Sequence, residues 1–164
     1  MPTDAGRTQE QTFGRGGVRA ELLQIRAQVA GVRGSLVATS DGLVVAHDIP
    51  DVEPTQIAAL AAATLAVARR ATLATECGTF REAVARGSDG YLAVYAAGDS
   101  AIVAVVGTSS LNVGMLQYRA REIIERIAAN SSRIGALAAP VRPANGEPAK
   151  NTRSLPRRRP AASS

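Results

Sequence analysis

The sequence has little cysteine, histidine or aromatic content, and each scarcity excludes a class of protein. A single cysteine, Cys77, cannot form a disulfide within the chain and excludes a cysteine-rich zinc site. A single histidine, His47, excludes a metal site built from several histidines. With 3% aromatic and 46% hydrophobic residues, a core must consist mainly of alanine, valine, leucine and isoleucine. No apolar run reaches about 18 residues without a charge or turn residue, which argues against a membrane-spanning helix.

The excess positive charge is confined to one end of the chain. The net charge is +5, and after Pro140 six basic residues face one acidic residue, Glu147, so the rest of the chain is formally neutral. We therefore assign the basic character to a tail and not to a fold. Contact of this tail with an anionic membrane or nucleic acid is a weaker hypothesis than a solvated tail, and the tail also lacks aromatic residues that would stack on the bases of a single strand. The basic residues are Arg142, Lys150, Arg153, Arg157, Arg158 and Arg159.

Length and composition predict one domain with two tails. Residues 1–17 are polar and glycine-rich, and residues 131–164 are rich in proline, alanine, serine and arginine, so both are predicted to be disordered. Residues 18–130 then form the folded domain. The N-terminus lacks the apolar core of a signal peptide, and we expect a cytoplasmic protein that reaches membranes only through partners.

Periodicity and turn residues predict an α+β domain with five mostly antiparallel strands covered by helices. The clearest turn is Ser40-Asp41-Gly42, because Asp-Gly between two β-rich runs is typical of a hairpin. A strand over 79–86 carries charges and is predicted to lie at an edge. Ser109 or Ser110 is predicted to cap the last helix. The expected helices cover 18–30, 54–78 and 111–129, and the expected strands cover 32–39, 43–48, 79–86, 91–96 and 101–106.

The helix from Pro54 to Gly78 is apolar on every side, whereas an ordinary surface helix has one polar face. A sheet beneath it and a partner helix above it would explain this pattern. The alternative is an alanine-rich helix that merely reflects a GC-rich genome. One line of residues at helical spacing forms its main stripe: Ile57, Leu60, Ala61, Thr64, Ala68 and Ala71.

Few residues are candidates for chemistry. No glycine-rich loop ends in Lys-Ser or Lys-Thr, so the chain is not predicted to hydrolyse nucleotides or to bind a cofactor. His47 and Asp48 are strand neighbours that point to opposite faces, so we interpret His47 as exposed or structural. Cys77 lies near a helix end, far from the positive end of the dipole that would activate a thiolate, so we interpret it as a packed cysteine and not a nucleophile. Arg69 and Arg70 fit either a solvated flank, with Arg69 near Glu76, or a contact with an acidic partner.

The order of elements resembles the roadblock/dynein light chain domain family, especially its bacterial MglB-like branch. The likeness covers about residues 18–129 and leaves both tails outside. Each motif alone is a turn or a cap, but their order and spacing together are specific. The stretches that carry the likeness are the hairpin over 31–42, the alanine-rich helix over 57–71, Arg86 to Tyr91, Ala97-Gly98-Asp99, and Leu111 to Gly114.

The resemblance implies a roadblock/profilin-like fold and a homodimer in which two central helices pack side by side and two edge strands pair. If the two-fold axis passes near Val84, Glu82 faces Arg86 of the other chain, and reversing both charges should restore a dimer that either single reversal weakens. The helix residues of this interface would be Ile57, Leu60, Ala61, Thr64 and Ala68, and its strand residues Arg81, Glu82, Val84 and Arg86.

For function, the resemblance implies a non-enzymatic regulator or scaffold that binds a small Ras-like GTPase, with a sensor kinase complex as a further candidate partner. The docking surface would include Gln56, Ala59, Ala63, Arg69 and Arg70. The alternative is a small-ligand sensor of PAS-like or GAF-like type, which would need a cavity lined by convergent polar groups. Against it, the small aliphatic strand residues predict a filled core.

Overall fold

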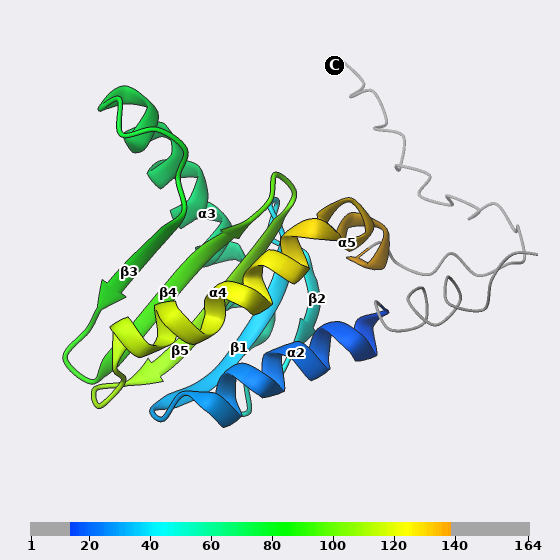
Figure 1. Ribbon diagram of the computed structural model, residues 1–164, viewed down its shortest axis with the longest axis vertical. Helices are drawn as coiled ribbons and strands as arrows, with labels where there is room; N and C mark the ends of the chain where they lie inside the picture. The colour runs from blue at the N-terminus through cyan, green and yellow to red at the C-terminus, as the bar shows by residue number, and fades with distance from the viewer. Residues whose placement is uncertain (1–13, 139–164) are drawn as a thin grey trace, which may run out of the picture.

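The computed structural model describes residues 14–138, which form one antiparallel sheet with helices on both faces (Figure 1). The helices are α2 (Arg15–Gln28), α3 (Pro54–Ala74), α4 (Val113–Ala129) and α5 (Ser131–Ala138). The strands are β1 (Val32–Thr39), β2 (Val44–His47), β3 (Glu82–Arg86), β4 (Gly90–Ala97) and β5 (Ala101–Thr108). They lie in the order β2-β1-β5-β4-β3. The α+β class, the five strands and the edge position of β3 are therefore confirmed.

The β1–β2 hairpin forms where the sequence predicted it. Gly42 has a φ of 90°, a value that favours glycine, and the Thr39 amide donates to the Leu43 carbonyl at 2.9 Å. At the other end of β2 the buried Asp48 accepts hydrogen bonds from the amide of Ser35 at 2.6 Å and from its hydroxyl at 2.9 Å. Asp48 thus joins the two strands and does not polarise His47.

Two separate cores lie on the two faces of the sheet. The larger one packs α2, α4 and α5 against the sheet through residues such as Leu22, Leu116 and Ile134. The smaller one packs α3 against the opposite face through residues such as Leu36, Leu65 and Ile102. Both consist almost wholly of aliphatic side chains, as the composition predicted. A salt bridge between Glu21 and Arg126 joins α2 to α4 and raises the pKa of Arg126, chiefly through the hydrogen bond.

Three predictions were wrong, two at the ends of the domain and one at the cap of α4. Helix α2 begins at Arg15, although residues 15–17 were assigned to the tail, and residues 131–138 form α5. The Arg15 guanidinium donates to the carbonyl of Leu137 at 2.8 Å, so these two additions stabilise each other. Asn112, and not Ser109 or Ser110, caps α4 by accepting from the Met115 amide. The remaining tail predictions, for residues 1–13 and 139–164, lie outside the described residues.

Candidate interaction surface

Only a narrow line of α3 contacts the sheet, and it differs from the predicted stripe. The fully buried residues are Ala58, Ala61 and Leu65, which are spaced at helical intervals and pack into the smaller core. Leu60 is 52% exposed and Val67 is 70% exposed. The helix is therefore rotated relative to the predicted stripe, because Leu65 and not Leu60 is its large buried residue. The outward face of α3 is a surface of leucine, valine and alanine.

The residues predicted for the helical interface fall into three groups. Leu60 lies on the exposed face, and Ile57, Thr64 and Ala68 lie half-buried on the flanks. Ala61 is fully buried against the sheet, so it has no surface for a second chain, and its assignment to the interface was wrong. Thr64 satisfies its hydroxyl by donating to the Leu60 carbonyl at 2.8 Å. The hydroxyl therefore does not add an unpaired polar group to this apolar surface.

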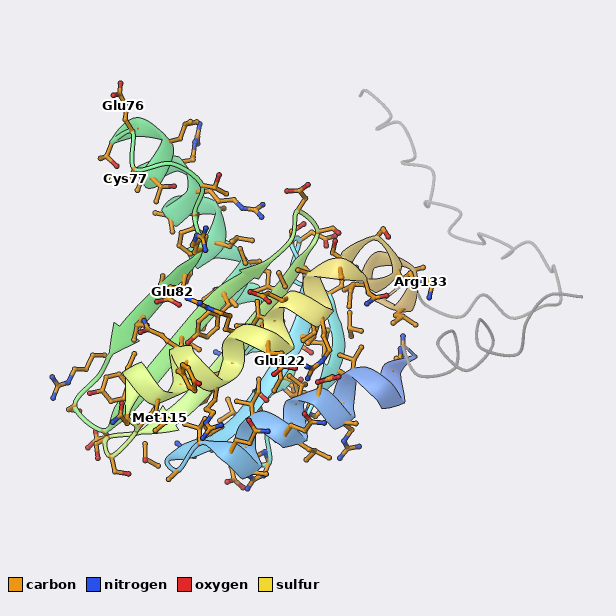
Figure 2. The ribbon with its side chains drawn as sticks, viewed as in Figure 1. Glu76, Cys77, Glu82, Met115, Glu122 and Arg133 are labelled. Atoms are coloured by element: carbon orange, nitrogen blue, oxygen red, sulfur yellow. The ribbon has the colours of Figure 1, made fainter. Side chains whose placement is uncertain are left out.

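The last turns of α3 project beyond the sheet (Figure 1). Leu73 is 79% exposed there, and Figure 2 shows Glu76 and Cys77 at the tip, away from the sheet. Cys77 is therefore exposed, and its interpretation as a packed cysteine was wrong. By length and hydropathy α3 is a candidate membrane span, contrary to the sequence-based expectation, yet it crosses the sheet and contacts all five strands.

The residues predicted for partner docking are mostly exposed on α3. Gln56, Ala59 and Ala63 lie on its outward side, and so does Arg70, for which the described residues offer no ion pair. Arg69 differs because its guanidinium donates to the carbonyl of Gly98 at 3.2 Å in the β4–β5 turn. The predicted contact with Glu76 is not the one that forms. Arg70 is thus the available cation on this face, and Arg69 holds the helix on the turn.

The outer edge of β3 has no strand beside it among residues 14–138. Glu82, Val84 and Arg86 alternate along β3 and lie opposite Tyr95, Ala93 and Tyr91 of β4. The Gln117 side chain on α4 donates to the Glu82 carboxylate, and the Arg86 guanidinium lies 5.7 Å from the centre of the Tyr91 ring. The charges of Glu82 and Arg86 are therefore held at the two ends of a short apolar edge.

A groove of about 1200 Å³ lies where the projecting end of α3, the start of β3 and the flank of α4 meet. Its lining includes Arg81, Arg121 and Tyr95. Tyr95 is 3% exposed, and its hydroxyl has no hydrogen-bond partner in the described part of the chain. Burial, together with the nearby Glu82, raises the pKa of Tyr95, so the hydroxyl remains a protonated donor. No local pattern in the sequence indicated this groove, because segments far apart in the chain build it.

Within residues 14–138 no group of three histidine, cysteine or carboxylate side chains is arranged to hold a metal ion. The strongest features of the surface are therefore the apolar face of α3, the free edge of β3 and the groove beside it. An exposed apolar helix face and a free strand edge are features of surfaces that bind other polypeptides, whereas a groove also suits a small ligand.

Comparison with known proteins agrees with this architecture. Residues 19–107 match the Roadblock/LC7 domain, which is more than half of the chain. The chain belongs to the Roadblock/LC7 family. This roadblock domain is 29% identical over 109 residues to an uncharacterized protein of Methanocaldococcus jannaschii, covering 66% of this chain and 94% of the other.

Solved structures show the same fold. The gliding protein MglB of Thermus thermophilus superposes with a TM-score of 0.64 at 21% identity, covering 71% of this roadblock domain's chain and 89% of MglB. An MglB described in a tetrameric arrangement gives a TM-score of 0.64 at 22% identity, with coverages of 73% and 91%. Profilin IA of Acanthamoeba castellanii gives a TM-score of 0.50 at 10% identity, with coverages of 71% and 97%. The predicted family and the roadblock/profilin-like fold are thus confirmed.

Proposed function

We propose that this roadblock domain is a non-enzymatic homodimeric regulator or scaffold that binds a small Ras-like GTPase and modulates its nucleotide cycle or its recruitment. The observation that carries the proposal is the outward face of α3, where Leu60 and Val67 are exposed in a single chain. An exposed apolar surface of this kind is more often a protein–protein interface than a surface that stays in contact with water. The family and the likeness to MglB structures support the same assignment. We place the protein in the cytoplasm, where it would meet such a GTPase and a sensor kinase complex.

In this proposal the dimer forms through α3 and the free edge of β3. A two-fold axis through Val84 would place each residue of β3 opposite the one equally far from Val84 in the second copy, so Glu82 would face Arg86. Pairing would satisfy the free backbone groups of β3 and bring opposite charges together at both ends of the edge. The neutral centre of β3, Ala83 to Ala85, suits the axis itself.

A cysteine at the axis should cross-link the two copies. In a background with Cys77→Ser, Val84→Cys would face itself across the axis, within the separation that a disulfide requires. Oxidation should therefore convert most of this variant to a disulfide-linked dimer on a non-reducing gel. Ala85→Cys is the matched control, because in this register it faces Ala83. Stronger cross-linking at 85 than at 84 would move the axis, and none at either position in a dimeric protein would remove β3 from the interface.

The GTPase would dock over the paired α3 helices. Gln56, Ala59 and Ala63 would supply close contact through small side chains, Arg70 would pair with acidic or phosphate groups, and Arg69 would hold the helix in place. The catalytic groups would belong to the GTPase, whose own residues the contact would rearrange. This division of roles requires no nucleophile or metal site on the roadblock domain.

Charge reversal at Arg70 should weaken GTPase binding without changing the dimer. With the small GTPase encoded nearest to this protein in its genome, Arg70→Glu should raise the dissociation constant at least about tenfold, which corresponds to about 1.4 kcal/mol. Arg26→Glu on α2 is the control, because Arg26 is exposed on the opposite face. Binding would be measured by titration and its effect by GTP hydrolysis. Equal affinity of all three proteins would place the docking surface elsewhere.

A small-ligand sensor remains the second candidate, and the groove that Tyr95 lines is the observation in its favour. Its volume slightly exceeds the roughly 300–1,000 Å³ usual for small-molecule pockets, and it opens to solvent along the edge of β3. The two filled aliphatic cores favour the first candidate. A metabolite that raises the melting temperature of wild-type protein but not of Tyr95→Phe would support the sensor.

A further inference from the structure

The groove beside β3 has polar groups for which residues 14–138 supply no partner. Among these residues the buried Tyr95 hydroxyl has no hydrogen-bond partner, and neither Arg81 nor Arg121 forms an ion pair. Burying a hydroxyl without a partner costs free energy, so a native structure normally supplies one. The buried hydroxyl therefore indicates that a further polar group reaches the groove, and the two exposed arginines would suit an acidic one.

The position of the groove along β3 limits what can occupy it. Its lining includes Arg81 and Glu82, at the start of the free edge, and the Arg81 carbonyl still accepts from the Ala96 amide of β4. A strand added to the edge would run directly past this point. In the two-fold arrangement through Val84, Glu82 faces Arg86 of the second copy, and Arg81 faces Gly87. The segment that follows Gly87 is the β3–β4 turn.

We infer that the β3–β4 turn of a second copy, Gly87 to Gly90, closes each groove and places its Asp89 carboxylate against Arg81. The inference rests on the dimer of the proposed function and adds the occupant of the groove. The turn is compact, because the Gly87 amide donates to the Gly90 carbonyl at 2.8 Å. The Ser88 hydroxyl donates to one oxygen of Asp89 at 2.6 Å, which leaves the other oxygen to accept from an arginine.

The charges of the turn and of the groove are complementary. Asp89 is the turn's acidic side chain, and it is exposed in a single chain, as is Arg81. On the other face of the paired β3 strands, Arg86 of the second copy would reach Glu82 and Tyr95, which lie opposite each other on β3 and β4. Its guanidinium could then donate to both the Glu82 carboxylate and the Tyr95 oxygen. The groove is thus completed twice in the dimer, once on each side of the axis.

A charge exchange tests this contact. Arg81→Glu and Asp89→Arg, each made in the full chain, should raise the dimer dissociation constant about tenfold, because each places two pairs of like charges at the seam. The double variant Arg81→Glu/Asp89→Arg restores opposite charges and should return to within about threefold of wild type. Arg119→Glu is the matched control, because Arg119 lies on α4 beside Tyr118 and away from β3. Sedimentation equilibrium gives all five constants.

The outcomes separate this inference from the proposed function. A dimeric wild type with single variants that match it would overturn the contact between Arg81 and Asp89, while the dimer and its GTPase docking would stand. Two weakened single variants with a double variant weaker still would also overturn it, because the two residues would then act independently. A monomeric wild type at micromolar concentration would overturn the inference together with the dimer. Weakened singles and a restored double would establish the turn as the occupant.

Discussion

Val67→Asp is expected to convert the protein from a dimer to a monomer that keeps its fold. Val67 is 70% exposed in a single chain, so an aspartate there remains in water and changes the stability of the monomer by less than about 0.5 kcal/mol. In the dimer the same position would lie between two α3 helices lined by alanine. Two carboxylates would then be desolvated close to each other in an apolar contact, which costs several kcal/mol.

The dimer dissociation constant should therefore rise at least about 100-fold, which corresponds to about 2.7 kcal/mol. Sedimentation equilibrium measures this change, and circular dichroism shows that the helices persist. Leu23→Asp is the matched control, because Leu23 is 47% exposed on α2, on the opposite face of the sheet. A Val67→Asp protein that dimerises like wild type would show that α3 is not buried between copies. The GTPase platform proposed on it would then lose its basis.

Local chemistry explains why most of the fold could be predicted from sequence. The Asp41-Gly42 turn needs a positive φ that glycine supplies, and the charges on β3 are those of an edge strand. Pro54 at the start of α3 and Glu53 before it, which accepts from the Thr55 amide, define that helix at its first turn. These signals act within a few residues, so they can be recognised without knowledge of the rest of the chain.

The rotation of α3 could not be predicted because alanine carries little directional information. With alanines on every side of the helix, several orientations would bury similar apolar areas. The surface of the sheet determines which of these orientations the helix adopts. Gly42 shows how: a side chain there would come within 3.4 Å of Ala58 and Ala59, so the hairpin turn lies directly against the helix. That contact and the Arg69 bond to Gly98 fix which face turns inward.

The groove and α5 were missed for a different reason. The groove is built by α3, the start of β3 and α4, which are distant in sequence, and its unpaired Tyr95 looks like an ordinary strand residue. Helix α5 is short and rich in serine, glycine and alanine, a composition also typical of a disordered tail. It folds because Ile134 is fully buried in the larger core and Arg15 caps the last turn. Tertiary contacts decide both features.

Gly90→Ala should destabilise the protein by about 3 kcal/mol, whereas Gly87→Ala should change its stability by less than about 1 kcal/mol. A Cβ at Gly90 would lie far inside contact distance of the carbonyl oxygen of Gly107, a backbone atom of β5. Relief of that contact requires the central strand to move, which disturbs the pairing of β4 with β5 and the two cores that depend on it.

At Gly87, in the same turn, the nearest atom to an added Cβ is the Gly90 carbonyl oxygen at 3.7 Å, an ordinary contact distance. The two variants therefore add the same methyl group to one turn and differ in what it meets. Urea unfolding at one fixed protein concentration measures both, because a dimer's apparent stability depends on concentration. Equal stability of the two variants would mean that the pairing of β4 with β5 adjusts to the added methyl group more easily than a packed sheet should. The sheet would then be too deformable to keep β3 straight, as pairing with β3 of a second copy requires.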